Sequence, residues 1–134
     1  MTRKILFTGA VFGVLSIVLG AFGAHALKEV LSESSLASFK TAVNYQIYHA
    51  LFLLIFGVIQ SKFGKHLTKV IYYLCTFGVI CFSGSIYFLI FNKHFQFVDM
   101  PSWLALLTPL GGVFLISSWV LLGMYLVKNV KSDA

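Results

Sequence analysis

Charged residues are scarce in this chain and confined to short stretches. Asp, Glu, Lys and Arg make up 10% of its 134 residues, and none occurs at 5–27, 41–61, 70–92 or 100–127. Soluble domains are about 25% charged, so the composition argues against an ordinary soluble fold. Each charge-free window reaches the roughly 20 residues that a helix needs to cross a bilayer core.

The apolar windows leave no room for a separate soluble domain. The chain is 59% hydrophobic, with a mean hydropathy of +0.92. Backbone in lipid must satisfy its own hydrogen bonds, and the windows are too long and too uniformly apolar for barrel strands. The connections are short, so neighbouring spans must run antiparallel. We predict one all-α transmembrane domain over residues 1–134, an up-down-up-down four-helix bundle with spans at 5–26, 41–61, 70–92 and 102–127.

The basic residues favour one orientation in the membrane. With the N-terminus inside, the inner segments hold Arg3, Lys4, Lys62, Lys65, Lys69, Lys128 and Lys131, and the outer loops hold Lys28, Lys40 and Lys93. The positive-inside rule therefore predicts that both termini face inward. Topology and attraction to anionic membrane lipid explain the formal charge of +6, and we expect no nucleic-acid partner.

The cysteines and the acids are too few, or wrongly placed, for several kinds of site. Cys75 and Cys81 are six residues apart and face different sides of a helix, which argues against a disulfide or a metal pair. No Asp or Glu lies within a span, so Ser83 and Ser85 lack a carboxylate that could orient a catalytic base. We therefore expect no catalytic residues and no cofactor, and we favour a non-enzymatic protein.

Small residues form a stripe along one face of the first span. The stripe consists of Gly9, Gly13, Ser16, Gly20 and Gly23, which fall within about 80° of arc. It predicts close helix packing, either within the bundle or between protomers. The stripe also argues against removal of this segment as a signal peptide, although AHA at 24–26 matches a cleavage site. Gly111 and Gly112 are interpreted as packing residues in the fourth span.

Polar side chains gather on the predicted inward faces of the other spans. Tyr45 and Gln46 precede His49 by four and three residues, so the three can meet on one helix face. In the predicted topology the polar residues belong to the outer half of the membrane. The candidate ligand site or polar network comprises His25, Tyr45, Gln46, His49, Ser83, Ser85, Tyr87 and Thr108.

His49 leaves three interpretations open. It could be a buried histidine that hydrogen-bonds to neighbouring helices. It could bind a ligand, a lipid headgroup or a proton, because ionisable groups within membranes tend to be functional. As a third possibility, His25 and His49 could ligate haem or a metal as a pair, although no HxxxH motif and no nearby carboxylate supports this.

Four motifs resemble those of a known family. They are FGAHAL (22–27), FKTAVNYQIYHAL (39–51), FSGSIY (82–87) and TPLGG (108–112). In their order and spacing they are similar to the YgdD/YwdK-like family of small, uncharacterised bacterial membrane proteins. The resemblance covers all four spans and implies a four-span integral membrane protein that retains its first span. It implies no activity, so no catalytic role is carried over.

The sequence supports a ranked set of functions. We expect a multi-pass protein of the bacterial plasma membrane, or alternatively of the mitochondrial inner membrane, that binds a lipid, a small amphiphile or a membrane partner through the outer-half polar residues. The first alternative is a small oligomeric transporter or channel subunit that associates through the glycine stripe, although no internal repeat is visible. The second alternative is a membrane protein with haem or metal bound to histidine.

Overall fold

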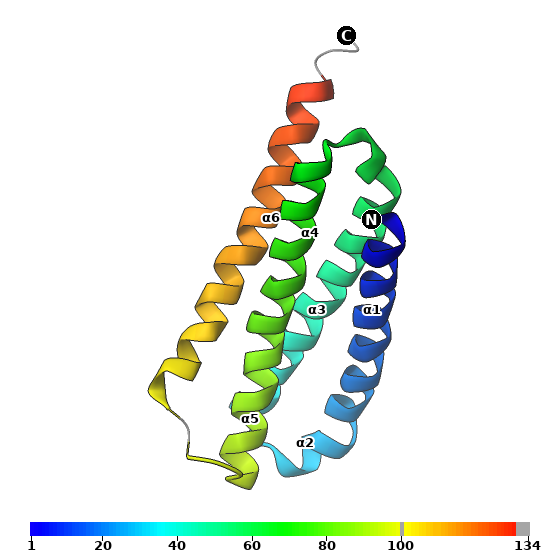
Figure 1. The fold of residues 1–134 in the computed structure, drawn as a ribbon. Coiled ribbons are helices and arrows are strands. Elements are labelled where there is room, and N and C mark those ends of the chain that lie inside the picture. The colour runs from blue at the N-terminus through cyan, green and yellow to red at the C-terminus, as the bar shows by residue number, and fades with distance from the viewer. Residues whose placement is uncertain (100, 131–134) are drawn as a thin grey trace.

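Four long antiparallel helical stretches form the protein (Figure 1). The computed structural model describes residues 1–99 and 101–130, so the inner-side base Lys131 lies outside the described part. The long elements are α1 (Thr2–Ala24), α3 (Glu33–Ile59), α4 (Lys65–Val79), which continues through η2 (Ile80–Gly84) into α5 (Ser85–Phe95), and α6 (Leu107–Val130). The short elements are α2 (Ala26–Val30), η1 (Gln60–Lys62) and η3 (Ser102–Leu106). Four stretches are long and apolar enough to cross a membrane, which confirms the predicted all-α four-span class.

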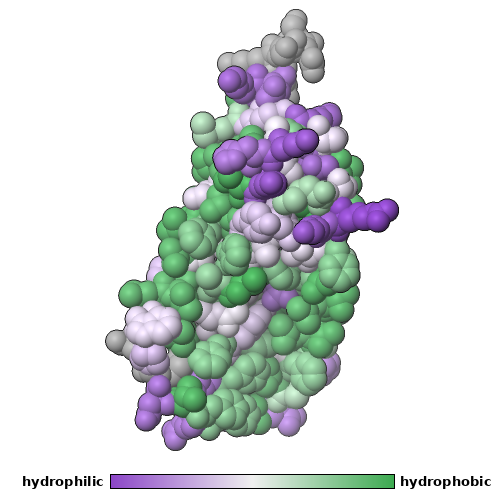
Figure 2. Space-filling view, viewed as in Figure 1, coloured by the Kyte–Doolittle hydropathy of each residue, from purple (hydrophilic) through white to green (hydrophobic). Residues whose placement is uncertain are grey.

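One end of the bundle carries most of the positive charge. The start of α1, the turn at η1 and the end of α6 lie at this end, which is uppermost in Figure 1. Its described bases are Arg3, Lys4, Lys62, Lys65, Lys69 and Lys128, and we call it the basic end. Figure 2 shows hydrophilic residues gathered there and hydrophobic residues over much of the surface below. The predicted orientation places the basic end inside the cell.

Helix α3 begins before its charge-free window because a polar residue caps it. Ser32 is the N-cap of α3, and its Oγ accepts a hydrogen bond of 3.3 Å from the Ser35 backbone N–H. The helix therefore begins at Glu33, well before the apolar window. Its first turns carry Phe39, which is fully buried against α1 and α5.

The glycine stripe of α1 faces α3 within the same chain. A Cβ on Gly9 would lie 3.0 Å from the Ala50 carbonyl oxygen, and a Cβ on Gly23 would lie 3.0 Å from the Phe39 ring. Gly57 of α3 packs equally closely on α1, because a Cβ added there would lie 2.6 Å from Leu6 Cδ2. The stripe thus holds α1 against α3, and this face is not free for a second protomer.

The third span contains a wider turn where it meets α6. Residues Ile80–Gly84 form a π-helical segment between α4 and α5. A Cβ on Gly111 would lie 2.8 Å from Phe82 Cα, so the backbones of α6 and η2 are in direct contact. The FSGSIY and TPLGG motifs of the sequence therefore meet as one close helix contact.

Candidate functional site

A glutamine in the middle of α3 links three helices. The Gln46 side chain is 4% exposed, and its Nε2 donates to the Phe12 carbonyl oxygen of α1 at 3.0 Å. The Tyr87 hydroxyl of α5 donates to Gln46 Oε1, also at 3.0 Å. One side-chain amide thus fixes α1 and α5 against α3, and this pairing compensates for its burial among apolar residues.

His49 links α3 to α6. The Trp119 indole Nε1 lies 3.1 Å from His49 Nε2, and the indole N–H can only donate. His49 Nε2 must therefore be the acceptor, so the ring proton sits on Nδ1 and is donated to the Tyr45 carbonyl oxygen at 2.7 Å. Both ring nitrogens of this neutral histidine are engaged, and neither is left for a metal or haem iron.

Two serines hold the C-terminal end of the π-helical segment. Ser83 Oγ donates to the Ala42 carbonyl oxygen of α3 at 2.8 Å. Ser85 Oγ donates to the Phe82 carbonyl oxygen at 3.0 Å and lies 2.6 Å from Thr108 Oγ1. Because the Ser85 hydroxyl has a single proton, Thr108 is the donor in that second pair.

We call this set of hydrogen bonds the interlock. Its side chains are Gln46, His49, Ser83, Ser85, Tyr87, Thr108 and Trp119. They come from the three later spans and reach the backbone of the first. The arrangement positions helices, because its donors and acceptors are directed at one another rather than at a common open space.

Two of the predicted site residues lie elsewhere. Tyr45 was expected on the inward face, but its side chain is 42% exposed, and it contributes only its carbonyl oxygen. Its ring instead packs against Phe82, with a centroid distance of 4.8 Å. The pattern failed because Tyr45 lies at the edge of the polar arc, where contact with η2 covers only part of its side chain.

His25 is exposed at the end of α1 and is separated from His49 along the bundle. Gly23 packs on Phe39, near the start of α3, whereas Phe12 is level with Gln46. Phe12 and His25 are 13 residues apart, which corresponds to about 20 Å along a helix. The possible His25–His49 ligand pair is therefore not brought together. Over residues 1–99 and 101–130, no three His, Cys, Asp or Glu residues are grouped as metal ligands would be.

The partner of His49 was not predicted from the sequence. Trp119 had the relevant signal, because an indole N–H within a membrane span needs an acceptor. Residue types alone did not identify which acceptor on which helix it would meet.

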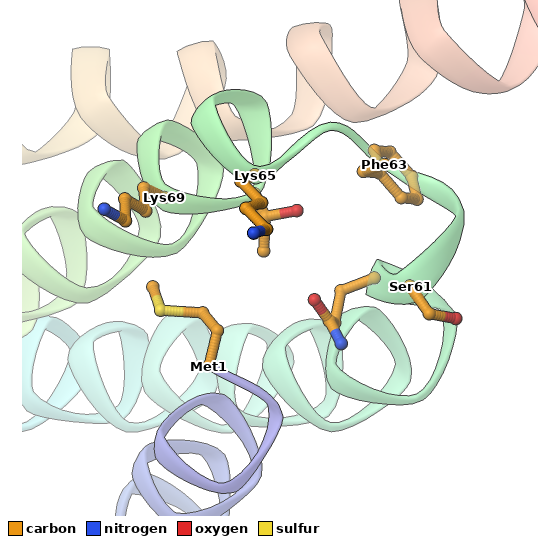
Figure 3. Close-up of a pocket in the computed structure, with 7 residues that line it drawn as sticks. Met1, Ser61, Phe63, Lys65 and Lys69 are labelled. Carbon is orange, nitrogen blue, oxygen red and sulfur yellow. The ribbon is translucent and has the colours of Figure 1, made fainter.

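Several hollows in the described part of the chain lie away from the interlock, and two of them share a lining residue. The first, at the basic end, has a volume of about 390 Å³ and is lined by Met1, Gln60, Ser61, Phe63, Lys65, Thr68 and Lys69 (Figure 3). The second, which we call the α4–α6 groove, has a volume of about 400 Å³ and is lined by His66, Lys69, Val70, Tyr73, Leu74, Phe77 and Phe114. Lys69 borders both hollows. The positive charge of this region was predicted from the sequence, whereas the hollows were not.

The fold and the interlock define a multi-pass α-helical membrane protein. The chain belongs to the family described as protein of unknown function (DUF423), whose sequence model matches residues 19–112. It is 36% identical over 127 residues to the UPF0382 membrane protein YwdK of Bacillus subtilis, covering 94% of this chain and 98% of that protein.

A second relative is the UPF0382 membrane protein of Staphylococcus epidermidis, which is 33% identical over 126 residues, covering 94% of this chain and 97% of the relative. No solved structure matches the chain. The resemblance drawn from the four motifs is confirmed, and the relatives are bacterial membrane proteins of an uncharacterised family.

Proposed function

We propose that the protein is a non-enzymatic lipid-binding protein of the bacterial plasma membrane, oriented with its basic end toward the cytoplasm. The observation that carries the proposal is the α4–α6 groove, whose walls are almost wholly apolar and which has His66 and Lys69 at the end nearest the basic end. The interlock supports this site indirectly, because polar groups that are hydrogen-bonded between helices are not available to a ligand. Lipid binding is therefore assigned to the flank of the bundle rather than to the polar residues of its middle.

The chemistry of the groove suits an acyl chain. Val70, Leu74, Phe77 and Phe114 present apolar surface, and Tyr73 adds a half-exposed ring. Lys69 and His66 stand at the end nearest the basic end, where a lipid headgroup would lie. An apolar groove with a cation at one end matches the acyl chain and the headgroup of a phospholipid.

A pair of matched substitutions tests this assignment. Val70→Trp fills the groove, whereas Val58→Trp places the same side chain on a highly exposed position of α3 outside it. Native mass spectrometry of protein released gently from membranes should show fewer bound lipids for Val70→Trp than for wild type, with Val58→Trp unchanged. Equal lipid retention by both variants and wild type would remove the groove as the binding site.

The other two functional classes gain no support from the geometry. The transporter alternative used the glycine stripe between protomers, and that stripe is packed on α3. The haem or metal alternative used His25 and His49, which lie at different levels of the bundle, and His49 has both ring nitrogens engaged.

A further inference from the structure

The hollow at the basic end combines a helix start, two lysines and a buried hydroxyl. In Figure 3, Lys65 and Lys69 on α4 lie across the hollow from Met1 at the start of α1, and Ser61 and Phe63 border it at the turn between α3 and α4. Three separate elements therefore enclose a space with positive charge on one wall.

The start of α4 lacks a side-chain cap. Its N-cap is Gly64, which has no side chain that could accept a hydrogen bond from the free backbone N–H groups of the first turn. The space beside Gly64 is open, because a Cβ there would meet nothing within 4 Å among the described residues. Free N–H groups and the helix dipole favour an anion at this position.

Thr68 supplies the independent observation that points to a ligand. It lines the hollow and is 2% exposed, and its Oγ1 has no hydrogen-bond partner in the described part of the chain. A buried hydroxyl without a partner is unfavourable, so such a group calls for an explanation. A ligand oxygen in the hollow would accept this hydrogen bond and satisfy the hydroxyl.

The surrounding charge selects an anion. Every charged side chain described at the basic end is a base, whereas the described acids Glu29, Glu33 and Asp99 belong to the connections at the opposite end. Lysine ammonium groups, helix N–H groups and a hydroxyl together form the donor set that binds phosphate oxygens.

We propose that this hollow binds the phosphate of an anionic phospholipid. Lys65, Lys69 and Thr68 bind the headgroup, and an acyl chain of the same lipid runs along the α4–α6 groove. Lys69 lines both hollows, and this shared residue favours a lipid, which has a headgroup and an acyl chain to place in them, over free phosphate. The inference rests on the proposed lipid binding and adds the class of headgroup.

The test uses the whole protein in nanodiscs made from an equal mixture of phosphatidylglycerol and phosphatidylcholine. The ratio of the two lipids that stay bound is read by native mass spectrometry. Wild type should retain phosphatidylglycerol in excess over the mixture. Lys65→Gln and Lys69→Gln should each lower this ratio about fivefold. The double control Lys4→Gln/Lys62→Gln removes the same charge from exposed positions outside the hollow and should change the ratio less than the double variant Lys65→Gln/Lys69→Gln.

Thr68 gives a second comparison that does not alter charge. Thr68→Val keeps the shape and should lower the ratio, whereas Thr68→Ser keeps the hydroxyl and the ratio. In pure phosphatidylcholine nanodiscs, Thr68→Val should not lower the melting temperature, because it removes a hydroxyl that has no partner there.

The possible outcomes separate the two proposals. Lipid retained without preference for phosphatidylglycerol, or an equal loss in the charge control, overturns the headgroup site and leaves lipid binding intact. No retained lipid at all overturns the proposed function itself. Two stabilisations of the wild-type protein are also compared: that by inorganic phosphate added to phosphatidylcholine nanodiscs, and that by phosphatidylglycerol included in the nanodiscs. If inorganic phosphate stabilises the protein as much as phosphatidylglycerol does, the hollow is assigned to free phosphate instead.

Discussion

Trp119 of α6 donates its indole N–H to Nε2 of His49 on α3, at 3.1 Å. The pairing determines the tautomer of the histidine and joins helices from the two halves of the chain. Gln46, one turn from His49 on α3, likewise joins α3 to α1 and α5 through hydrogen bonds. The polar start of an apolar span is thus explained by packing, since each inward group is paired with another helix.

Replacing His49 should loosen the contact between α3 and α6. His49→Leu leaves the indole N–H of Trp119 without its acceptor, and we expect a loss of about 0.5–2 kcal/mol in the free energy of unfolding. Unfolding in mixed micelles by a denaturing detergent measures this loss. His94→Leu, at an exposed position, is the control. If His49→Leu/Trp119→Phe is as unstable as the sum of the two single variants, the hydrogen bond contributes nothing.

Removing the Gln46 amide should affect two contacts at once. Gln46→Leu deprives Tyr87 of its acceptor and the Phe12 carbonyl of its donor, so a loss of about 1–2 kcal/mol is expected. Asn44→Leu changes an exposed amide on the same helix and should have little effect. A double-mutant cycle with Tyr87→Phe reads the coupling, and strict additivity would contradict the pairing.

Two adjacent glycines should respond differently to the same change. A Cβ on Gly111 would press on the Phe82 backbone, whereas a Cβ on Gly112 would lie 3.9 Å from the Phe82 ring. Gly111→Ala should destabilise by about 1–3 kcal/mol, because backbone cannot give way as a side chain can. Gly112→Ala should be neutral or slightly stabilising, since alanine favours helix. Thermal unfolding of both variants decides, and equal effects would refute the close contact of α6 with η2.

The orientation of the bundle is also open to measurement. The distribution of bases predicts that a membrane-impermeant maleimide labels Lys28→Cys, but not Lys128→Cys, in intact cells. Wild type serves as the blank, because Cys75 and Cys81 lie within the third span. The reverse labelling pattern would place the basic end, and with it the proposed headgroup site, on the outside.

The sequence predicted the architecture because membrane insertion depends on the length and composition of each span. It also identified Gln46, His49 and Ser83 as inward-facing, since helical periodicity holds along α3 and α4. It misplaced Tyr45, because the width of the buried face depends on where the neighbouring helices lie. The π-helical turn at Ile80–Gly84 and the hollow around Thr68 arise from packing between distant segments, and no local pattern encodes them.

Native mass spectrometry of the wild-type protein, extracted gently from its own membrane, tests the central claim most directly. We expect the intact chain to carry phospholipid, with anionic species enriched over their share of the membrane, and the Val70→Trp variant to lose lipid. A chain that carries no lipid under conditions that preserve its fold, or one that carries haem or stoichiometric metal instead, would contradict it.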